Sequence, residues 1–287
     1  MILTHTPAEM HAACRSLRNT GHTLGLVPTM GALHLGHLSL VSAALQQNDA
    51  VAVSIFVNPT QFGPNEDFAD YPRTFDDDCR KLESAGVHLL FAPSAAAMYP
   101  PGNTTFVDPG PIATRLDGAS RPGHFRGVAT IVTRLFSIIA PDRAYFGQKD
   151  AAQVAVLRHI VRDLNLPVSL VVCPIVREPD GLALSSRNRY LSPAERTRAL
   201  ILSRALRAAE SLARAGETSA ETLRAAMLCV FATADPDPTL NAVPIRLDYA
   251  AVVNPDTLQP LADTRNGALL AIAAHIGSTR LIDNLLL

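Results

Sequence analysis

The stretch from Thr23 to Val41, TLGLVPTMGALHLGHLSLV, constrains the fold of this chain more than any other. Its first part, Leu24 to Val27, is a short apolar run typical of a buried strand, and Pro28 and Gly31 mark the turn that follows. From Gly36 onward the apolar residues return at helical spacing. The segment therefore predicts a strand, a turn and a helix in direct succession.

Two histidines stand where that helix is predicted to begin, near Leu35. A helix N-terminus offers unpaired backbone N–H groups and the positive end of the helix dipole, and Gly36 lets an anion approach without a Cβ in the way. His34 and His37 would lie on one side of the first turn, where both can donate to phosphate oxygens. The alternative is that one histidine caps the loop and the other is solvated.

Further apolar runs predict a parallel sheet. Val51 to Val57 (VAVSIFV) is a continuous β-branched run, as expected for a strand buried on both faces. Further strands are expected at 87–92, 142–146 and 168–176, with a short one at 104–107, and helices at 6–19, from 74, at 128–139 and at 151–165. Strands that alternate with helices indicate an α/β fold, a Rossmann-like parallel sheet with helices on both faces.

The C-terminal part changes character and predicts a smaller α+β domain. Ser192 to Glu195 is a capping box with proline at the first helical position, and it predicts one long helix to about Ala215. A second helix is expected from Thr218, followed by strands at 246–253, 268–276 and 278–282. We therefore expect two domains, 1–177 and 178–287, with Ser185 to Arg187 near their cleft.

Polar segments follow two of the predicted strands, at the edge where open α/β sheets bind ligands. Asn58 to Gly63 makes Gln61 a site candidate, although Asn58 and Gln61 could equally satisfy the backbone of the turn. Gly147 to Asp150 places Lys149 at a helix entry, as in a phosphate clamp. A surface lysine is the alternative, but the chain has only two lysines, Lys81 and Lys149, among 25 cationic residues.

Three other segments carry charged side chains near predicted helix starts or in a loop. The three aspartates 76–78 open a predicted helix, and we interpret them as a solvated helix start rather than a metal site. Arg121, His124 and Arg126 lie near another helix start, where cations oppose the dipole unless something negative is present. The segment 184–187 combines serine hydroxyls with an arginine, which by itself is typical of an exposed linker. Gly181 before it could act as a hinge.

Composition excludes several classes of partner. A formal net charge of −1 and a pI near 6.7 provide no basic field for a nucleic acid, so small molecules are the expected ligands. Cys14, Cys79, Cys173 and Cys229 are scattered without metal-binding spacing, and we expect buried thiols in a reducing cytoplasm. No run reaches the ~18 apolar residues of a membrane span, so we expect no membrane association.

The segment HLGH at 34–37 resembles the H-x-G-H motif of nucleotidyltransferases and class I aminoacyl-tRNA synthetases. With its flank, PTMGALHLGH, it is similar to the pantothenate synthetase (pantoate–beta-alanine ligase) family. The resemblance extends over the whole chain, through IFVNPTQF, RPGHFRGV, GQKDAAQ, the serine loop at 184–187 and the terminal RLIDN. The chain departs from the family pattern at Thr60, where methionine is frequent, at Gln148, where the family has glutamate, and at Ala152, where it has glutamine.

The resemblance implies an ATP-dependent condensation of (R)-pantoate with β-alanine through a pantoyl adenylate, releasing AMP and diphosphate, within pantothenate (vitamin B5) and coenzyme A biosynthesis. It implies catalytic roles for His34, His37, Lys149 and Arg187, and contacts of Gln61 and Gln153 with pantoate or β-alanine. The ATP site that it implies comprises Met30, Gly31, Ala32, Leu33, His34, Leu35, Gly36, His37, Gly147, Gln148, Lys149, Asp150, Val176, Leu184, Ser185, Ser186 and Arg187.

The same resemblance implies Mg²⁺ that arrives with ATP and no metal site of the protein's own. It also implies a cytoplasmic homodimer whose C-terminal domain forms a lid over the cleft. Two alternatives stay open at this point. A nucleotidyltransferase acting on a phosphate acceptor would share H-x-G-H and the serine loop but would want additional basic residues, and a non-catalytic nucleotide-binding module would not need Lys149.

Overall fold

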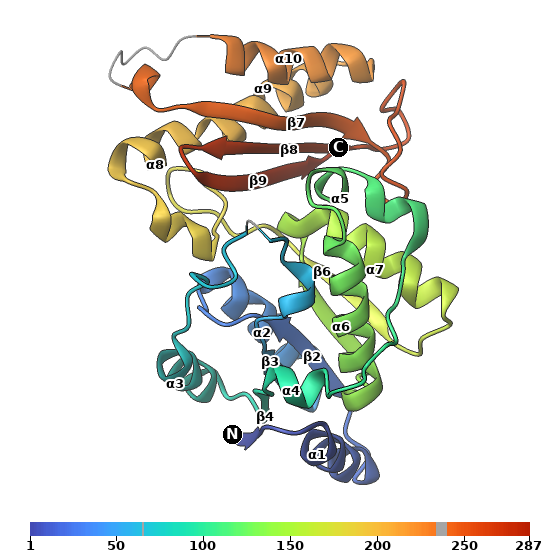
Figure 1. Cartoon of the computed structure of the whole chain (residues 1–287). Coiled ribbons are helices and arrows are strands. Elements are labelled where there is room, and N and C mark those ends of the chain that lie inside the picture. Colours follow the sequence, from blue (N-terminus) through green and yellow to red (C-terminus); the bar gives the residue numbers. More distant parts are fainter. Residues whose placement is uncertain (65, 234–239) are drawn as a thin grey trace. The chain divides into compact units, whose positions relative to one another are not determined.

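The computed structural model describes residues 1–64, 66–233 and 240–287, which form two compact units (Figure 1). The first unit comprises Met1–Thr114, Arg121–Gly147 and Val156–Pro174. The second comprises Arg115–Ser120, Gln148–Ala155 and Ile175–Leu287. Each unit has its own sheet and its own apolar core, as the two-part sequence pattern predicts.

The first unit contains a six-stranded parallel sheet, which confirms the predicted fold class. The strands are, in spatial order, β1 (Ile2–Thr4), β4 (Leu89–Phe91), β3 (Ala50–Ile55), β2 (Leu24–Thr29), β5 (Arg143–Gly147) and β6 (Ser169–Cys173). Strands β2 and β3 are almost completely buried, as expected of strands covered on both faces. The edge strand β1 was not predicted, because it has only three residues and two of them are exposed.

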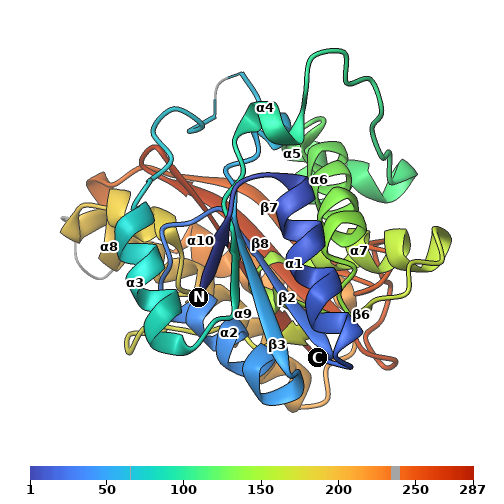
Figure 2. The same cartoon turned by 90° about the horizontal axis from the view of Figure 1, so that it is seen from below.

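Helices cover both faces of this sheet (Figure 2). The helices of the first unit are α1 (Pro7–Asn19), α2 (Leu35–Gln47), α3 (Phe75–Ala85), α4 (Ala95–Met98) and α6 (His124–Ile139), while α7 (Ala151–Asp163) spans the division between the units. Helices α2 and α3 lie on one face, and α1 and α6 lie on the other. The apolar face of α2 packs with β2 and β3 through fully buried side chains such as Val41, Val27 and Val53.

The order of the strands locates a ligand-binding edge. The chain passes from β2 to β3 to β4 in one direction across the sheet, and then returns to place β5 on the other side of β2. Ligands of open α/β sheets bind outside the carboxyl ends of the strands at such a reversal. The segments that follow β2 and β5 are HLGH and GQKD, the two that the sequence singles out.

The second unit contains a three-stranded antiparallel sheet, β7 (Ile245–Val253), β8 (Leu269–Ile276) and β9 (Thr279–Leu286). Its helices are α5 (Asp117–Ser120), α8 (Pro193–Ala199), α9 (Ile201–Arg214) and α10 (Ala220–Ala232). Helices α9 and α10 pack against the sheet, and Leu206, Met227 and Ile272 are fully buried between them. This arrangement matches the predicted α+β domain.

Two predicted elements are wrong. Residues 104–107 form no strand, because the N–H of Val107 donates to the Thr130 hydroxyl of α6 instead of to a neighbouring strand. The single long helix predicted from Ser192 to Ala215 is two helices, because the N–H of Leu200 bonds the carbonyl of Thr197, three residues back, and interrupts the α-helical pattern.

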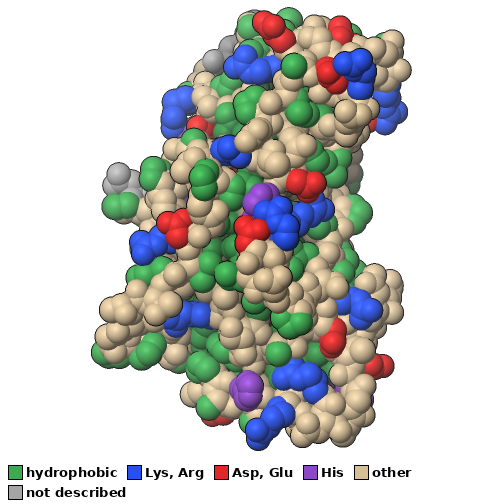
Figure 3. All heavy atoms as spheres, turned by 90° about the vertical axis from the view of Figure 1, so that its right-hand side faces the viewer, with side chains coloured by type: hydrophobic (Ala, Val, Ile, Leu, Met, Phe, Trp, Pro, Cys, Tyr) green, Lys and Arg blue, Asp and Glu red, His purple; other side chains and the backbone are tan. Residues whose placement is uncertain are grey.

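Surface charge, cysteine burial and helix hydropathy can be compared with the expectations from composition. Figure 3 shows Lys and Arg side chains interspersed with Asp and Glu on one face of the molecule, in keeping with the near-zero net charge. Cys14 and Cys173 are buried as predicted, whereas the prediction is wrong for Cys79, which is partly exposed, and for Cys229, which is exposed. In the described part of the chain, none of the helices has the length and apolar character needed to traverse a bilayer.

Candidate active site

The loop between β2 and α2 is held in place by one buried carboxylate, that of Asp78. Asp78 of α3 is 1% exposed and accepts hydrogen bonds at 2.8 Å from the backbone N–H groups of Ala32 and Leu33. Gly31 adopts φ of 84°, a backbone conformation that favours glycine, and a Cβ there would lie 3.2 Å from the Asp78 carboxylate. The loop is therefore fixed before the helix begins.

This contact corrects the interpretation of the three aspartates 76–78. The prediction of a solvated helix start is wrong for Asp78, whose carboxylate also accepts a hydrogen bond from the Thr74 hydroxyl. Asp77 instead pairs with Lys81 at 2.6 Å, and the Lys81 ammonium donates to the carbonyl of Leu33. Among the described residues, no group of three histidine, cysteine or acidic side chains is placed to hold a metal ion.

His34 and His37 define the start of α2. His34 is the N-cap, and its Nδ1 accepts from the N–H of Gly36 at 3.1 Å, while Nδ1 of His37 accepts from the N–H of His34 at 3.4 Å. The two ring centroids lie 4.1 Å apart, on one side of the first turn as predicted. A neutral imidazole whose Nδ1 accepts carries its proton on Nε2, so both rings have Nε2 as the donor. Capping and anion binding are therefore compatible roles.

The turn after β3, η1 (Pro59–Gln61), is organised by Asn58. This residue is 1% exposed, and its Nδ2 donates to the carbonyl of Gly127 and to Oε1 of Gln61, both at 3.1 Å. Its Oδ1 accepts from the Tyr99 hydroxyl at 2.8 Å. Asn58 thus satisfies the turn, as the alternative interpretation had it. Nε2 of Gln61 lies 3.1 Å from the sulfur of Met30, which brings together two predicted site residues.

Helix α6 packs directly on this turn at Gly127. A Cβ at that position would lie 2.3 Å from the carbonyl oxygen of Thr60, so any larger residue would push the helix and the turn apart. The Thr60 hydroxyl donates to Asn58 Oδ1 at 3.0 Å and lies 3.2 Å from the Tyr99 hydroxyl. Threonine, where the family often has methionine, is therefore part of the polar framework of the turn.

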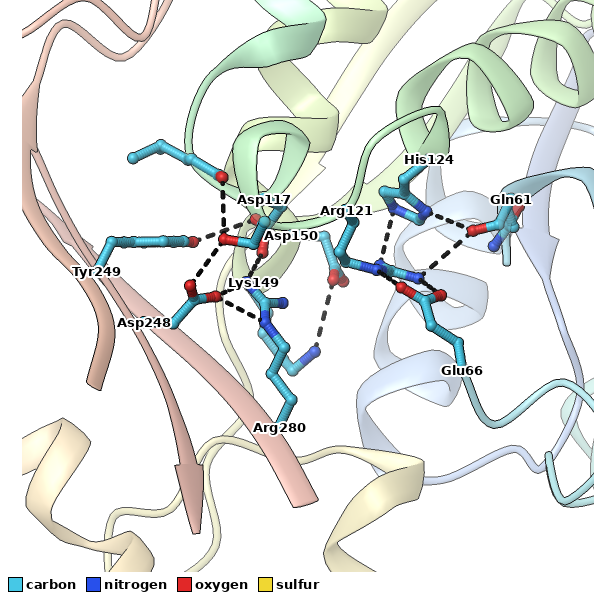
Figure 4. A network of polar contacts seen from close by, with 12 residues as sticks. Gln61, Glu66, Asp117, Arg121, His124, Lys149, Asp150, Asp248, Tyr249 and Arg280 are labelled. Atoms are coloured by element: carbon cyan, nitrogen blue, oxygen red, sulfur yellow. Dashed lines mark hydrogen bonds and ion pairs between the residues drawn. The ribbon is translucent and has the colours of Figure 1, made fainter. Parts of the chain in front are cut away.

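The N-terminus of α6 holds the backbone of Gln61. His124 Nδ1 lies 2.8 Å and Arg121 Nη2 3.4 Å from the Gln61 carbonyl oxygen, and Arg121 makes two contacts of 2.7 and 2.6 Å with the carboxylate of Glu66 (Figure 4). Glu66 is thus the negative partner that the cluster of cations requires. Burial raises the pKa of Glu66, but the hydrogen bonds and charge of Arg121 outweigh it and hold that pKa below its ordinary value. Arg126 instead stacks on the ring of Phe106.

In the second unit, the 3₁₀ turn η3 (Gln148–Asp150) follows directly on Gly147, the last residue of β5. The Lys149 ammonium lies 3.6 Å from a carboxylate oxygen of Asp150, and the lysine side chain is 21% exposed (Figure 4). Gln153 follows in the first turn of α7 and is half-buried.

The serine loop begins as a narrow hairpin in the same unit. The N–H of Leu184 donates to the carbonyl of Val176 at 3.0 Å, and Arg177 bridges Ala183. Ser185 then caps the 3₁₀ turn η4 (Ser186–Tyr190) by accepting from the N–H of Arg187. The segment is therefore structured, which the interpretation as a routine exposed linker did not anticipate.

The predicted residues thus form two groups. Met30 to His37 and Gln61 come together in the first unit, while Lys149, Gln153 and the segment 184–187 belong to the second, where strand β9 contacts both η3 and η4. Four supporting acidic or amide side chains were not predicted from the sequence, namely Glu66, Asp78, Asp283 and Asn284. The position of Asn284 in the terminal RLIDN was a signal, although it indicated no role.

A parallel sheet with histidines capping the helix after β2, and a lysine turn after β5, defines an α/β enzyme of the H-x-G-H nucleotide-binding class. The sequence model of the family described as Pantoate-beta-alanine ligase matches residues 2–286. The pantothenate synthetase of Koribacter versatilis is 56% identical over 287 residues, which is 100% of this chain and 96% of the relative. That of Roseiflexus sp. is 55% identical and covers 98% of both chains.

Solved structures similar to this chain come from the same family. A crystal structure of pantothenate synthetase from Thermus thermophilus has a TM-score of 0.90 at 48% identity and covers 99% of both chains. The pantoate-beta-alanine ligase of Francisella tularensis, described as complexed with beta-gamma ATP and beta-alanine, has a TM-score of 0.79 at 36% identity over 100% of this chain and 97% of that one. This chain belongs to the pantoate-beta-alanine ligase family. The comparisons support the ligase hypothesis and not the alternative of a nucleotidyltransferase acting on a phosphate acceptor.

Proposed function

We propose that this protein condenses (R)-pantoate with β-alanine at the expense of ATP, through a pantoyl adenylate, and releases AMP and diphosphate. One observation carries the proposal most. The loop that leads to HLGH follows the carboxyl end of β2, and GQKD begins at the carboxyl end of the neighbouring strand β5, where the strand order reverses. The ATP and β-alanine described for the related Francisella tularensis structure support the same substrates here.

The proposed chemistry requires charge relief more than acid–base catalysis. The carboxylate of pantoate is ionised at neutral pH, so its attack on the α-phosphorus of ATP needs alignment and stabilisation of the developing negative charge. The Nε2 donors of His34 and His37, the N-terminus of α2, and the cations Lys149 and Arg187 would supply that stabilisation. The remaining contacts with ATP are assigned to 30–33, Leu35, Gly36, Gly147, Gln148, Asp150, Val176 and 184–186.

The proposed pantoate contacts are the side-chain amides of Gln61 and Gln153, which can donate and accept to hydroxyls and a carboxylate. The surroundings of Gln61 support this assignment. Its Oε1 accepts from Asn58, whereas its Nε2 faces the sulfur of Met30, a weak acceptor that a substrate oxygen would readily replace. In the second half-reaction the amine of β-alanine would attack the acyl carbon and displace AMP, without a covalent enzyme intermediate.

We assign Mg²⁺ to the phosphates of ATP rather than to a cage of protein ligands. Mg²⁺ commonly binds through substrate phosphates with few carboxylates. The bound ion would neutralise phosphate charge. We further propose that the C-terminal domain, 178–287, forms a lid over the cleft and that the turn of Lys149, which belongs to the same compact unit, moves with it. We also propose that the enzyme works as a cytoplasmic homodimer.

Pyrophosphate exchange tests the proposed reaction. Labelled pyrophosphate is incubated with the enzyme, ATP and Mg²⁺, with or without pantoate, and β-alanine is left out. We expect label to enter ATP only when pantoate is present, because the adenylate must form reversibly before the amine arrives. Exclusive formation of ADP would contradict the adenylate and indicate an acyl-phosphate ligase.

A further inference from the structure

Strand β9 carries two adjacent polar residues that are almost completely buried. Asp283 and Asn284 are each 3% exposed, in a sheet whose other buried residues are mainly apolar. Burying such groups is unfavourable unless they form hydrogen bonds. The partners of Asp283 and Asn284 therefore identify the segments that these two side chains fix in place. Successive residues of a strand point to opposite faces, so the two side chains reach different neighbours.

The side chain of Asn284 forms hydrogen bonds with the turn that carries Lys149, η3 (Gln148–Asp150), which we call the lysine turn. Its Nδ2 donates to the carbonyl oxygens of Gln148 and Lys149, both at 2.9 Å, and its Oδ1 accepts from Nε2 of Gln148 at 3.0 Å. These bonds fix the backbone from which the Lys149 side chain projects. They also give a reason for the amide at position 148, where the family pattern has glutamate, because the Gln148 amide has a donor for Oδ1.

Asp283 holds the hairpin that leads into the serine loop. Its two carboxylate oxygens accept from Arg177 at 2.7 and 2.8 Å, and Arg177 also donates to the carbonyl of Gly181 at 3.1 Å. Such a two-point arginine–carboxylate pair is geometrically specific. The backbone bridge between Arg177 and Ala183 extends this support along the hairpin, because Ala183 lies only two residues before Ser185.

We propose that Asp283 and Asn284 are positioning residues that keep Lys149 and the segment 185–187 in one fixed relation, so that both can contact the same triphosphate. The inference rests on the proposed function, because it is there that Lys149 and Arg187 are assigned to ATP. A strand within a sheet suits this task, since its register with β8 is continuous from Thr279 to Leu286.

Asn284→Asp is the most direct test. The substitution is nearly isosteric, but it replaces Nδ2 by an oxygen that faces two carbonyl oxygens at 2.9 Å and so repels the turn. We expect KM for ATP to rise and kcat to fall, with kcat/KM for ATP reduced roughly 10- to 100-fold because small displacements of a binding group carry penalties of that order. KM for β-alanine should stay within about twofold. Asn19→Asp, at the exposed end of α1, is the matched control and should behave as the parent enzyme.

A double-mutant cycle separates positioning from general stability. If Asn284 acts through Lys149, then Asn284→Asp should change turnover by less than about threefold in a Lys149→Ala background. If the reductions in turnover caused by Asn284→Asp and Lys149→Ala multiply in the double variant, the inference is overturned. Unchanged turnover in Asn284→Asp alone would also overturn it. Asn284→Ala, which introduces no charge, gives the same comparison if the aspartate variant does not fold. Asp283→Asn should couple to Arg187→Ala in the same way.

The outcomes also distinguish this inference from the proposed function. Normal turnover in Lys149→Ala would remove the role of Lys149 in ATP chemistry, and the positioning role would fall with it. Slow turnover in Lys149→Ala, together with an Asn284 effect that is absent or independent, would leave the proposed function standing and overturn only the positioning role.

Discussion

Two loops of this protein are each held by one buried polar side chain, which accepts hydrogen bonds from the backbone in one case and donates them in the other. The carboxylate of Asp78 accepts hydrogen bonds at 2.8 Å from two successive N–H groups of the loop before α2. The amide of Asn284 donates at 2.9 Å to two successive carbonyls of the lysine turn. The side chains are 1% and 3% exposed, and each comes from an element distant in sequence. One is charged and the other is neutral, and this difference separates their expected effects.

Replacing Asp78 would leave buried donors without an acceptor, so it should lower stability, in addition to any effect through the loop 30–33 that we assign to ATP. Replacing Asn284 would disturb a turn that carries a functional lysine, so it should act mainly on turnover. The histidines differ again, because their ring nitrogens are oriented by bonds within the first turn of α2. The backbone of Lys149 is instead held by a residue 135 positions away.

The largest expected effect comes from removing the proposed phosphate donors themselves. His37→Ala and Lys149→Ala should each reduce turnover on the order of a hundredfold or more, because each removes stabilisation of charge that develops in the transition state. Steady-state turnover and pantoate-dependent pyrophosphate exchange measure the effect, with circular dichroism to show that the fold is preserved. Near-normal turnover in both variants would leave His37 and Lys149 with no more than a binding role.

The next largest effect is on stability. Asp78→Asn places an amide N–H against the loop N–H of Ala32, so the free energy of unfolding should fall by about 2–3 kcal/mol, the cost of a lost charge-assisted bond and an unpaired buried donor. Urea unfolding measures the loss. Asp76→Asn, in the same helix turn but exposed, is the control and should lose less than about 1 kcal/mol. Equal losses in the two variants would show that burial of Asp78 does not matter.

The smallest expected effect concerns the half-buried pair of Glu66 and Arg121. Because the folded-state pKa of Glu66 is lowered, the pair stabilises the protein fully above the ordinary pKa near 4.5 and loses this contribution as pH falls through the folded-state value. Glu66→Gln should therefore reduce stability at pH 7 by less than about 1 kcal/mol, since the pair is partly exposed to solvent.

Urea unfolding of the parent chain and of Glu66→Gln between pH 7 and pH 3 checks this. The difference between them should shrink toward zero at the acid end. A difference that grows as pH falls would show that the sign of the pKa shift is wrong, and one as large as that of Asp78→Asn would remove the distinction between buried and half-exposed supports.

Local signals were sufficient for the strand, turn and helix around His34 and His37, because apolar period, glycine and capping all act within a few residues. They were also sufficient to place Lys149 just after a strand. They failed for Asp78, because acidic residues in a first helical turn are usually solvated and only the packing of α3 against α2 buries this one. They failed at 104–107 for a similar reason, since a side chain of α6 takes the place of a partner strand.

The most direct test of the account is a crystal structure of the protein with a non-hydrolysable ATP analogue and pantoate. We expect Nε2 of His37, the ammonium of Lys149 and the guanidinium of Arg187 within hydrogen-bonding distance of one triphosphate, with Asn284 still bonded to the lysine turn. A triphosphate bound at the start of α2 with Lys149 and Arg187 directed elsewhere would contradict it.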